Sequence, residues 1–169
     1  MIVAMLSLNG RELVAHFALF EGLSPDELDD ALDAGRVYEV GQGEFFFHQG
    51  EDSTMLYVIT TGRVKLSQVT ADGQQVIVAY FGPGEGLGIA MALNDKPCPG
   101  SAGAIEPCVA VGWRREAMLA LMEGNARLAL NGMRMVGARF AQMQSRFQEL
   151  ATQRVERRVA RALLRRVTG

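Results

Sequence analysis

The sequence is poor in cysteine and histidine, with two of each among 169 residues. Cys98 and Cys108 are too few for the disulfide framework of a small secreted domain, so we expect free thiols in a reducing compartment, the cytoplasm. An oxidised bridge between them, or a thiol switch, is the alternative. Two thiols also fall short of the four that a cysteine-ligated iron–sulfur cluster needs.

Catalytic sequence patterns are missing as well. A cupin-type metal enzyme needs several histidines and a carboxylate together, and nothing near His48 in the sequence completes such a set. The sequence contains no P-loop, no dinucleotide fingerprint and no candidate Ser-His-Asp set. We therefore expect that the protein is not an enzyme and that it has no metal site of its own.

Long apolar runs are absent too. Hydrophobic residues make up 49% of the chain, but no run approaches the roughly 20 residues that span a bilayer. Residues 1–8 are mildly apolar, without a basic segment before them or a clear cleavage site after them. We expect neither a membrane segment nor a signal peptide.

Charge of each sign is concentrated at one end of the chain, although the net charge is only −2. Residues 1–53 hold eleven acidic and two basic residues, a balance of −9, whereas residues 126–169 hold ten arginines and two acids, a balance of +8. A basic C-terminal end is compatible with a nucleic-acid contact, and equally with the solvated face of a helix.

Two short helices are predicted first, over residues 11–20 and 24–34. Leu13, Phe17 and Phe20 would face inward from the first. The second begins with Ser24 as N-cap and Pro25 at the first helical position. Glycine-punctuated strands follow, at 36–40, 44–48, 55–60, 63–69, 74–81, 101–105 and 108–113. Asp72-Gly73 predicts a hairpin. Short antiparallel strands at this spacing indicate a jelly-roll barrel, and residues 114–122 are predicted to form a short helix.

A long helix is predicted from Asn125, its N-cap, to about residue 153. Apolar residues recur along it at steps of three and four: Met133, Val136, Phe140, Met143, Phe147 and Leu150. This narrow stripe is typical of a coiled-coil seam. Since it is too short to hold alone in water, we expect a parallel homodimer along these residues. A single helix lying across its own domain is the alternative.

A different helical pattern begins after Leu150, with Val155, Val159 and Leu163 among arginines. The expected organisation is a β-roll with N-terminal helices over 1–124, a dimerisation helix over 125–153, and a linking segment over 154–169. The apolar stripe of the last segment leads us to expect a further domain after Gly169.

Three stretches carry a family resemblance. The first stretch combines H-Q-G-E, L-Y-V-I-T-T-G-R-V-K-L and A-D-G-Q-Q, in which Gly50, Gly62 and Gly73 would lie on turns. The second stretch is F-G-P-G-E-G-L-G, and the third is E-R-R-V-A-R-A-L-L-R. Together they resemble the sensor domain of the Crp/Fnr family of bacterial transcription regulators. The resemblance implies an α+β fold with a cyclic-nucleotide-binding-like jelly roll and a dimerisation helix. It also implies DNA binding through a C-terminal helix-turn-helix domain that is absent from this chain.

The resemblance also places an effector pocket between roll and long helix, at Gly88, Ile89, Ala90, Gly100, Ser101, Ala102, Phe140, Met143 and Gln144. In nucleotide-binding members a glutamate accepts the ribose hydroxyl and an arginine pairs with the phosphate. Here Ile89 and Gly100 stand at those positions, while Gly88, Ser101 and Ala102 match. An anionic phosphate would lose its partners at a cost of several kcal/mol. We therefore predict that cAMP is not the effector.

The effector itself stays open at this stage. Haem, in a gas sensor of the same family, is one alternative, with His16 and Cys98 as the only weak candidates for its axial ligands. The second alternative is a regulatory cyclic-nucleotide-binding module attached to a protein that does not bind DNA. For the Crp/Fnr-type regulator, the expected partners are a second copy of the chain, a small effector and, through the absent C-terminal domain, DNA.

Overall fold

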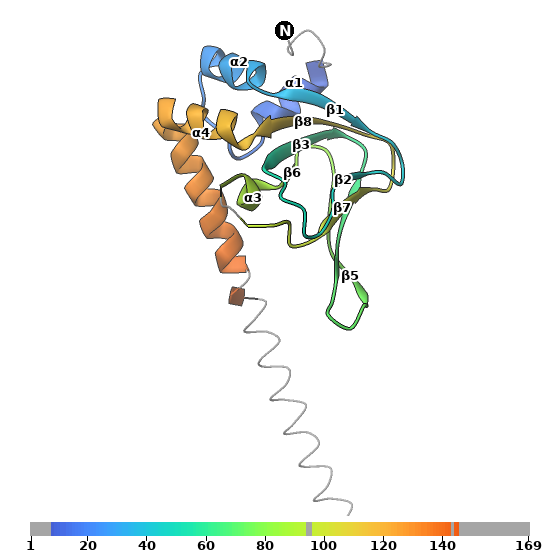
Figure 1. The fold of residues 1–169 in the computed structure, drawn as a ribbon. Coiled ribbons are helices and arrows are strands. Elements are labelled where there is room, and N and C mark those ends of the chain that lie inside the picture. Colours follow the sequence, from blue (N-terminus) through green and yellow to red (C-terminus); the bar gives the residue numbers. More distant parts are fainter. Residues whose placement is uncertain (1–7, 94–95, 143, 146–169) are drawn as a thin grey trace, which may run out of the picture. The chain divides into compact units, whose positions relative to one another are not determined.

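The structure is a computed structural model that describes residues 8–93, 96–142, 144 and 145. The chain divides into two compact units, Met1–Gly132 and Met133–Gly169, and each is described by itself. The first unit contains two four-stranded sheets that face each other, with short helices beside them (Figure 1).

In the part of the chain that the structure describes, the paired strands of both sheets are antiparallel. The first sheet has the order β1 (Arg36–Val40), β8 (Cys108–Arg114), β3 (Met55–Thr61), β6 (Gly86–Leu87). The second has the order β2 (Phe45–Phe47), β7 (Ser101–Ala104), β4 (Val64–Val69), β5 (Gln75–Phe81). This is the α+β antiparallel jelly roll that the sequence predicts.

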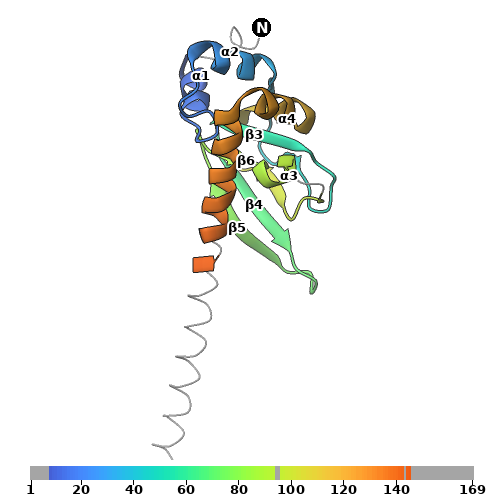
Figure 2. The ribbon, with the colours of Figure 1, turned by 90° about the vertical axis from the view of Figure 1, so that its left-hand side faces the viewer.

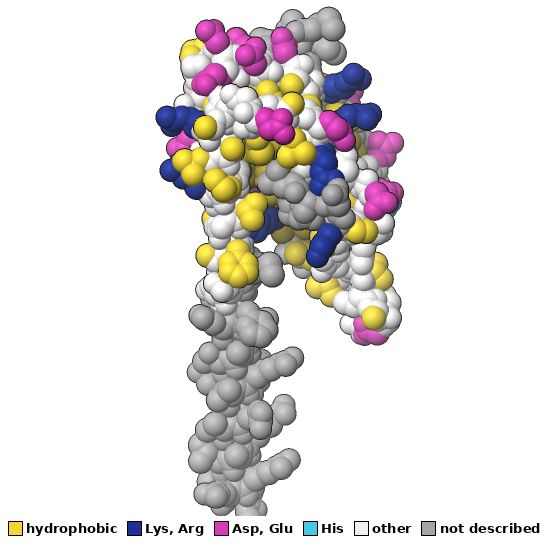
Figure 3. Space-filling model, turned by 60° about the vertical axis from the view of Figure 1, so that its left-hand side comes forward, with side chains coloured by type: hydrophobic (Ala, Val, Ile, Leu, Met, Phe, Trp, Pro, Cys, Tyr) yellow, Lys and Arg dark blue, Asp and Glu magenta, His cyan; other side chains and the backbone are white. Residues whose placement is uncertain are grey.

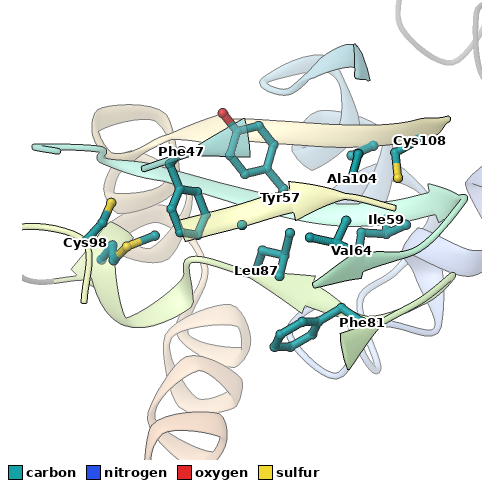
Figure 4. Packing of buried hydrophobic residues seen from close by; sticks show 12 residues of the cluster. Phe47, Tyr57, Ile59, Val64, Phe81, Leu87, Cys98, Ala104 and Cys108 are labelled. Atoms are coloured by element: carbon teal, nitrogen blue, oxygen red, sulfur yellow. The ribbon is translucent and has the colours of Figure 1, made fainter. Parts of the chain in front are cut away.

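The core lies between the two sheets (Figure 4). Ile59 of β3, Val64 of β4 and Ala102 of β7 are fully buried there, and Phe47 and Leu87 are nearly so. Burying apolar side chains from both sheets is the main stabilisation of such a sandwich. The core therefore fixes the two sheets against each other.

Glycine turns connect the strands where the sequence places them. Gly62, between β3 and β4, has a φ of +85°, and a Cβ there would lie 2.3 Å from the Pro107 carbonyl oxygen. Gly73, with a φ of +82°, closes the hairpin between β4 and β5. The Gly73 N–H bonds the Thr70 carbonyl and the Thr70 N–H bonds the Gln74 carbonyl. Figure 2 shows this hairpin running on beyond the rest of the roll.

The first helix differs from its prediction. Helix α1 spans Leu8–Ala15 instead of 11–20. Beyond it, the N–H groups of Phe17 and Phe20 bond carbonyls three residues back, those of Val14 and Phe17. These tighter turns still bury Phe17 and Phe20, at 6% and 2% exposure. The apolar spacing was thus correct about the burial of Phe17 and Phe20, whereas Leu13 is only partly buried and the predicted bounds of the helix were wrong.

Helix α2 spans Pro25–Asp33, as its start signals predict. The Glu27 N–H donates to Ser24 Oγ and the Ser24 N–H donates to Glu27 Oε2, which completes a capping box. The helix is tied to β8 by Trp113, whose Nε1–H donates to the Ala31 carbonyl at 2.6 Å. Because Trp113 is fully buried, this bond is shielded from water.

Two elements were missed by sequence reasoning, and both lie in the glycine-rich stretch 82–93. Strand β6 has only two residues, and helix α3, Ile89–Leu93, only five, so neither shows a period. Phe17 packs directly on Gly86 of β6, where a Cβ would lie 2.3 Å from Phe17 Cζ. The position therefore has room for glycine and not for a larger residue. Helix α4, Arg115–Gly124, follows β8 close to its predicted place.

Candidate effector site and dimer helix

The cassette that the sequence singles out begins at Gly88, where β6 turns into α3. Its φ is +84°, and a Cβ at this position would lie 2.2 Å from the Met55 carbonyl oxygen. Left-handed backbone this close to a neighbouring strand is open only to glycine. Gly88 therefore positions the start of α3 over β3.

Ile89 is the first residue of α3 and is 4% exposed. It stands where the family resemblance places a carboxylate, and its apolar side chain is packed away from water. Ala90 follows it in the same helix. The start of α3 therefore carries no group that accepts hydrogen bonds from a ribose.

Gly100 precedes β7, and its Cα approaches β4 closely. A Cβ there would lie 2.7 Å from the Ser67 carbonyl oxygen and 3.1 Å from Gln68 Cγ. The preceding loop is held by Gln68 Nε2, which donates to the Pro99 carbonyl at 2.7 Å. Any side chain here, arginine included, would require β4 to move. Gly100 thus permits the close packing of the cassette loop on β4, and it also lacks the charge that an arginine would supply.

Ser101 lies in β7, partly buried. Its Oγ accepts a hydrogen bond from the Gln49 backbone N–H at 2.9 Å. The Gln49 side chain also forms two hydrogen bonds with the Val69 backbone, at 3.1 and 2.7 Å. The hydroxyl that matches a phosphate ligand of the family is therefore engaged in tying 48–50 to the second sheet. Sequence reasoning missed the role of Gln49, whose only signal was its place in H-Q-G-E.

Apolar side chains surround the inner side of the cassette (Figure 4). Ala102 is fully buried, and Met91, Cys98 and Tyr57 belong to the same cluster. Burial, with Tyr38 beside it, raises the pKa of Tyr57 to about 12, so its phenol is neutral. Burial also raises the pKa of the Cys98 thiol. These side chains offer neutral, apolar contact and no counter-charge for an anion.

The two cysteines are free and buried, as the sequence predicts. Figure 4 shows Cys98 and Cys108 at opposite ends of the core. The Cys108 thiol donates to the Glu106 carbonyl at 3.1 Å. An oxidised bridge within one chain would require the core to open, so this alternative does not fit the fold.

The weak haem-ligand candidates do not form a ligand pair in this structure. His16 is exposed, with Nδ1 2.8 Å from the Glu12 carbonyl oxygen. Cys98 is 2% exposed, and its backbone is bonded to Gly50 and Glu51. An axial ligand must face a space that admits the haem. In the part of the chain that the structure describes, no three His, Cys, Asp or Glu side chains form a metal-binding group.

The long helix begins as predicted. Asn125 Oδ1 accepts hydrogen bonds from the backbone N–H groups of Arg127 and Leu128, at 3.0 and 3.1 Å. Leu128 is 1% exposed. Asn131 Nδ2 donates to the carbonyls of Leu19 and Glu21. The first two turns of the helix are thereby fixed to the N-terminal segment within the first unit.

The predicted dimer seam lies on the second unit, and its described members are open to solvent in the single chain. Met133, Val136 and Phe140 are 66%, 44% and 60% exposed. Met143, Phe147 and Leu150 lie outside the described residues. Exposed apolar residues at heptad spacing are what an unpaired coiled-coil seam presents.

The expected pocket between roll and long helix stays a prediction. Gly88, Ile89, Gly100, Ser101 and Ala102 all lie in the first unit, and Met91 of α3 and Ala102 of β7 belong to the same core cluster. Phe140 and Gln144 belong to the second unit, where both are exposed.

The fold and cassette together define a sensor roll of the cyclic-nucleotide-binding type. The family model described as "Cyclic nucleotide-binding domain" matches residues 38–125, and the chain belongs to this family. Close relatives of the chain are Crp/Fnr-type transcription regulators. It is 32% identical to the "Cyclic AMP receptor protein" of Thermus thermophilus, over 87% of this chain and 68% of that protein.

Two solved structures extend the comparison. The Thermus thermophilus catabolite activator protein matches with a TM-score of 0.75 and 30% identity, over 79% of this chain and 63% of that one. The sensor domain of the transcriptional regulator DNR from Pseudomonas aeruginosa matches with a TM-score of 0.70 and 27% identity, over 78% and 89%. The chain thus spans about two thirds of the length of the first two relatives, which are regulatory proteins and not enzymes. Among the described residues, no helix is long and apolar enough to cross a membrane.

Proposed function

We propose that this chain is the sensor and dimerisation part of a Crp/Fnr-type transcription regulator that responds to an effector other than cAMP. The observation that carries the proposal is the cassette: Ile89 and Gly100 stand where the family resemblance places the two nucleotide-binding residues, on a chain that belongs to the cyclic nucleotide-binding domain family. The two buried free cysteines agree with action in the reducing cytoplasm.

The chemistry of the cassette supports a neutral, largely apolar effector. The buried side chains around the cassette are apolar at Ile89, Met91 and Ala102 and neutral at Tyr57 and Cys98, so none of them supplies a charge for an anion. An uncompensated phosphate next to these groups would cost several kcal/mol relative to water. Ser101 cannot replace the lost charge, because a hydroxyl engaged with Gln49 supplies no positive group.

We also propose that two copies pair in parallel along the seam from Met133 to Leu150. The exposure of Met133, Val136 and Phe140 in the single chain supports this arrangement. In the proposed mechanism the effector binds between roll and long helix and shifts how the two helices pack. Residues 154–169 would pass this change to DNA-binding domains attached after them, as a shift between two populations of the dimer.

Isothermal calorimetry with cAMP tests the effector proposal. The full chain is expected to give no saturable heat at cAMP concentrations up to about 1 mM. A dissociation constant of about 1 mM corresponds to a binding free energy of only about −4 kcal/mol. The Thermus thermophilus protein, which is named for cAMP, is the positive control. A saturable isotherm with one cAMP per chain would overturn the effector proposal and leave the dimer proposal standing.

A further inference from the structure

A groove of about 400 Å³ lies between α2 and α4, away from the effector cassette. Its floor is formed by Ala117, Ala120 and Leu121 of α4, and its opposite wall by Glu27 and Asp30 of α2. On α4 these positions recur at steps of three and four, so they share one face of the helix. Small side chains on such a face let another backbone come close.

The groove is open along its length. Glu27, Asp30 and Ala120 are exposed, and Ala117 and Leu121 are only partly buried. A small-molecule site usually encloses most of its ligand's surface, which walls this exposed cannot do. An open apolar floor between two helices instead suits the apolar stripe of a third helix.

Both charged residues that line the groove are acidic, Glu27 and Asp30, although Arg127 lies close enough to Glu27 to help lower the pKa of its carboxyl group. Helix α2 carries five acids in nine residues and no basic residue. Arg11 pairs with Asp29 on the other side of α2, which leaves the groove wall acidic. The C-terminal carbonyls of α4 add partial negative charge near Gly124. Figure 3 shows acidic side chains gathered over the end of the roll unit that carries α2, with apolar surface beside them.

We propose that this groove is a docking site for a basic amphipathic helix of a partner protein. Arginine or lysine side chains of that helix pair with Asp30 and Glu27, and its apolar stripe packs on Ala117, Ala120 and Leu121. The site is independent of the effector cassette and goes beyond the proposed function.

A helix docked here contacts residues that hold the start of the long helix. Asn125 lines the groove and donates from Nδ2 to Glu27 Oε1 at 2.7 Å. The same Asn125 caps the long helix through its Oδ1. A cationic side chain that engages Glu27 competes with Asn125 for this carboxylate. Docking and the anchoring of the long helix are therefore linked through one hydrogen bond.

A labelled synthetic peptide that forms a helix with arginines on one side and leucines at three- and four-residue intervals on the other is a suitable probe, because it has the proposed chemistry and is not a segment of this chain. Its binding to the full chain can be followed by fluorescence anisotropy. Saturable binding is expected, together with shifts of the amide NMR signals of Ala117, Ala120 and Gly124. Affinity is expected to fall with added salt.

Two variants change the groove and one matched variant does not. Asp30→Lys reverses a wall charge and Ala120→Trp fills the floor; each is expected to weaken binding about tenfold or more, in the range of interface charge and packing changes. Glu123→Lys makes the same charge change on α4, outside the groove lining, and is expected to have a much smaller effect. All three positions are exposed, so the substitutions are expected to leave the core intact. Circular dichroism verifies that each variant is folded.

Three outcomes would overturn the proposal. In the first, the peptide does not bind saturably. In the second, Glu123→Lys weakens binding as much as Asp30→Lys, which would mean that the peptide is held by general charge attraction. In the third, the chain alone assembles beyond a dimer and Asp30→Lys abolishes that assembly, which would make a second copy of the chain the occupant. None of these outcomes bears on the cAMP calorimetry, so the two proposals fail separately.

Discussion

The Cα of Gly100 lies so close to the Ser67 carbonyl oxygen that a Cβ would approach that oxygen to 2.7 Å. The position at which the family resemblance places a phosphate-binding arginine therefore carries no charge, and a side chain there would meet the backbone of β4. Loss of the arginine and close packing of β4 against the cassette loop belong together, because the space that a side chain would need is filled by backbone.

The first prediction follows from this contact. Gly100→Ala is expected to lower the free energy of unfolding by about 1–3 kcal/mol, as overpacking does, measured by urea denaturation. Gly124→Ala is the control, because a Cβ there meets nothing within 4 Å and alanine favours a helix by up to about 1 kcal/mol. Equal stability of Gly100→Ala and wild type would show that β4 yields at no cost.

The second prediction concerns the dimer seam. Phe140→Ala is expected to weaken a dimer by about 2–4 kcal/mol, since each dimer would lose two large apolar side chains from its interface. Sedimentation velocity over a dilution series measures the change in dissociation constant. Leu119→Ala on α4 is the control, because Leu119 is also exposed, at 40%, and lies outside the seam. A Phe140→Ala chain that dimerises as tightly as wild type would contradict the seam assignment.

The sequence was sufficient for the parts of the fold that depend on local chemistry. The Ser24 cap, the Asp72-Gly73 hairpin and the Asn125 cap all occur where their residue types predict. Each of these signals is complete within a few neighbouring residues, so no distant contact can override it. The same holds for the cassette glycine, Gly88, whose positive φ matches the residue that the resemblance implies.

Contacts between distant segments could not be predicted in this way. Strand β6 is defined by the pairing of its two residues with β3, and Phe17, just beyond the end of α1, packs against Gly86. The bond between Gln49 and Ser101 joins residues 52 positions apart. No local sequence pattern contains such a contact. For this reason the hydrogen bond that engages Ser101 of the cassette could be found only in the structure.

The third prediction uses the titration of Tyr57. A tyrosine whose folded pKa is raised stabilises the fold fully below its unfolded pKa of about 10, and this contribution is lost as the pH rises through about 12. The ultraviolet absorbance of tyrosinate should therefore show one group titrating near pH 12 in the folded chain. Tyr57→Phe should remove this late phase, and Tyr80→Phe, which changes an exposed tyrosine, should leave it. A late phase that survives Tyr57→Phe would assign it elsewhere.

The fourth prediction concerns Glu27, which links the two helix caps. The Ser24 backbone and side-chain hydrogen bonds, with a smaller contribution from Asn125, hold its pKa below the usual 4.5. Since the folded pKa is the lower one, the carboxylate stabilises the fold fully above about pH 4.5 and loses this effect as the pH falls through the folded value. Glu27→Gln should therefore destabilise the chain at pH 7 and differ less from wild type near pH 3, in urea midpoints measured at both. Asp26→Asn is the control, because Asp26 lies in the same first turn outside the capping box. If the difference between Glu27→Gln and wild type were the same at both pH values, the carboxylate charge would play no part in holding α2 to the start of the long helix.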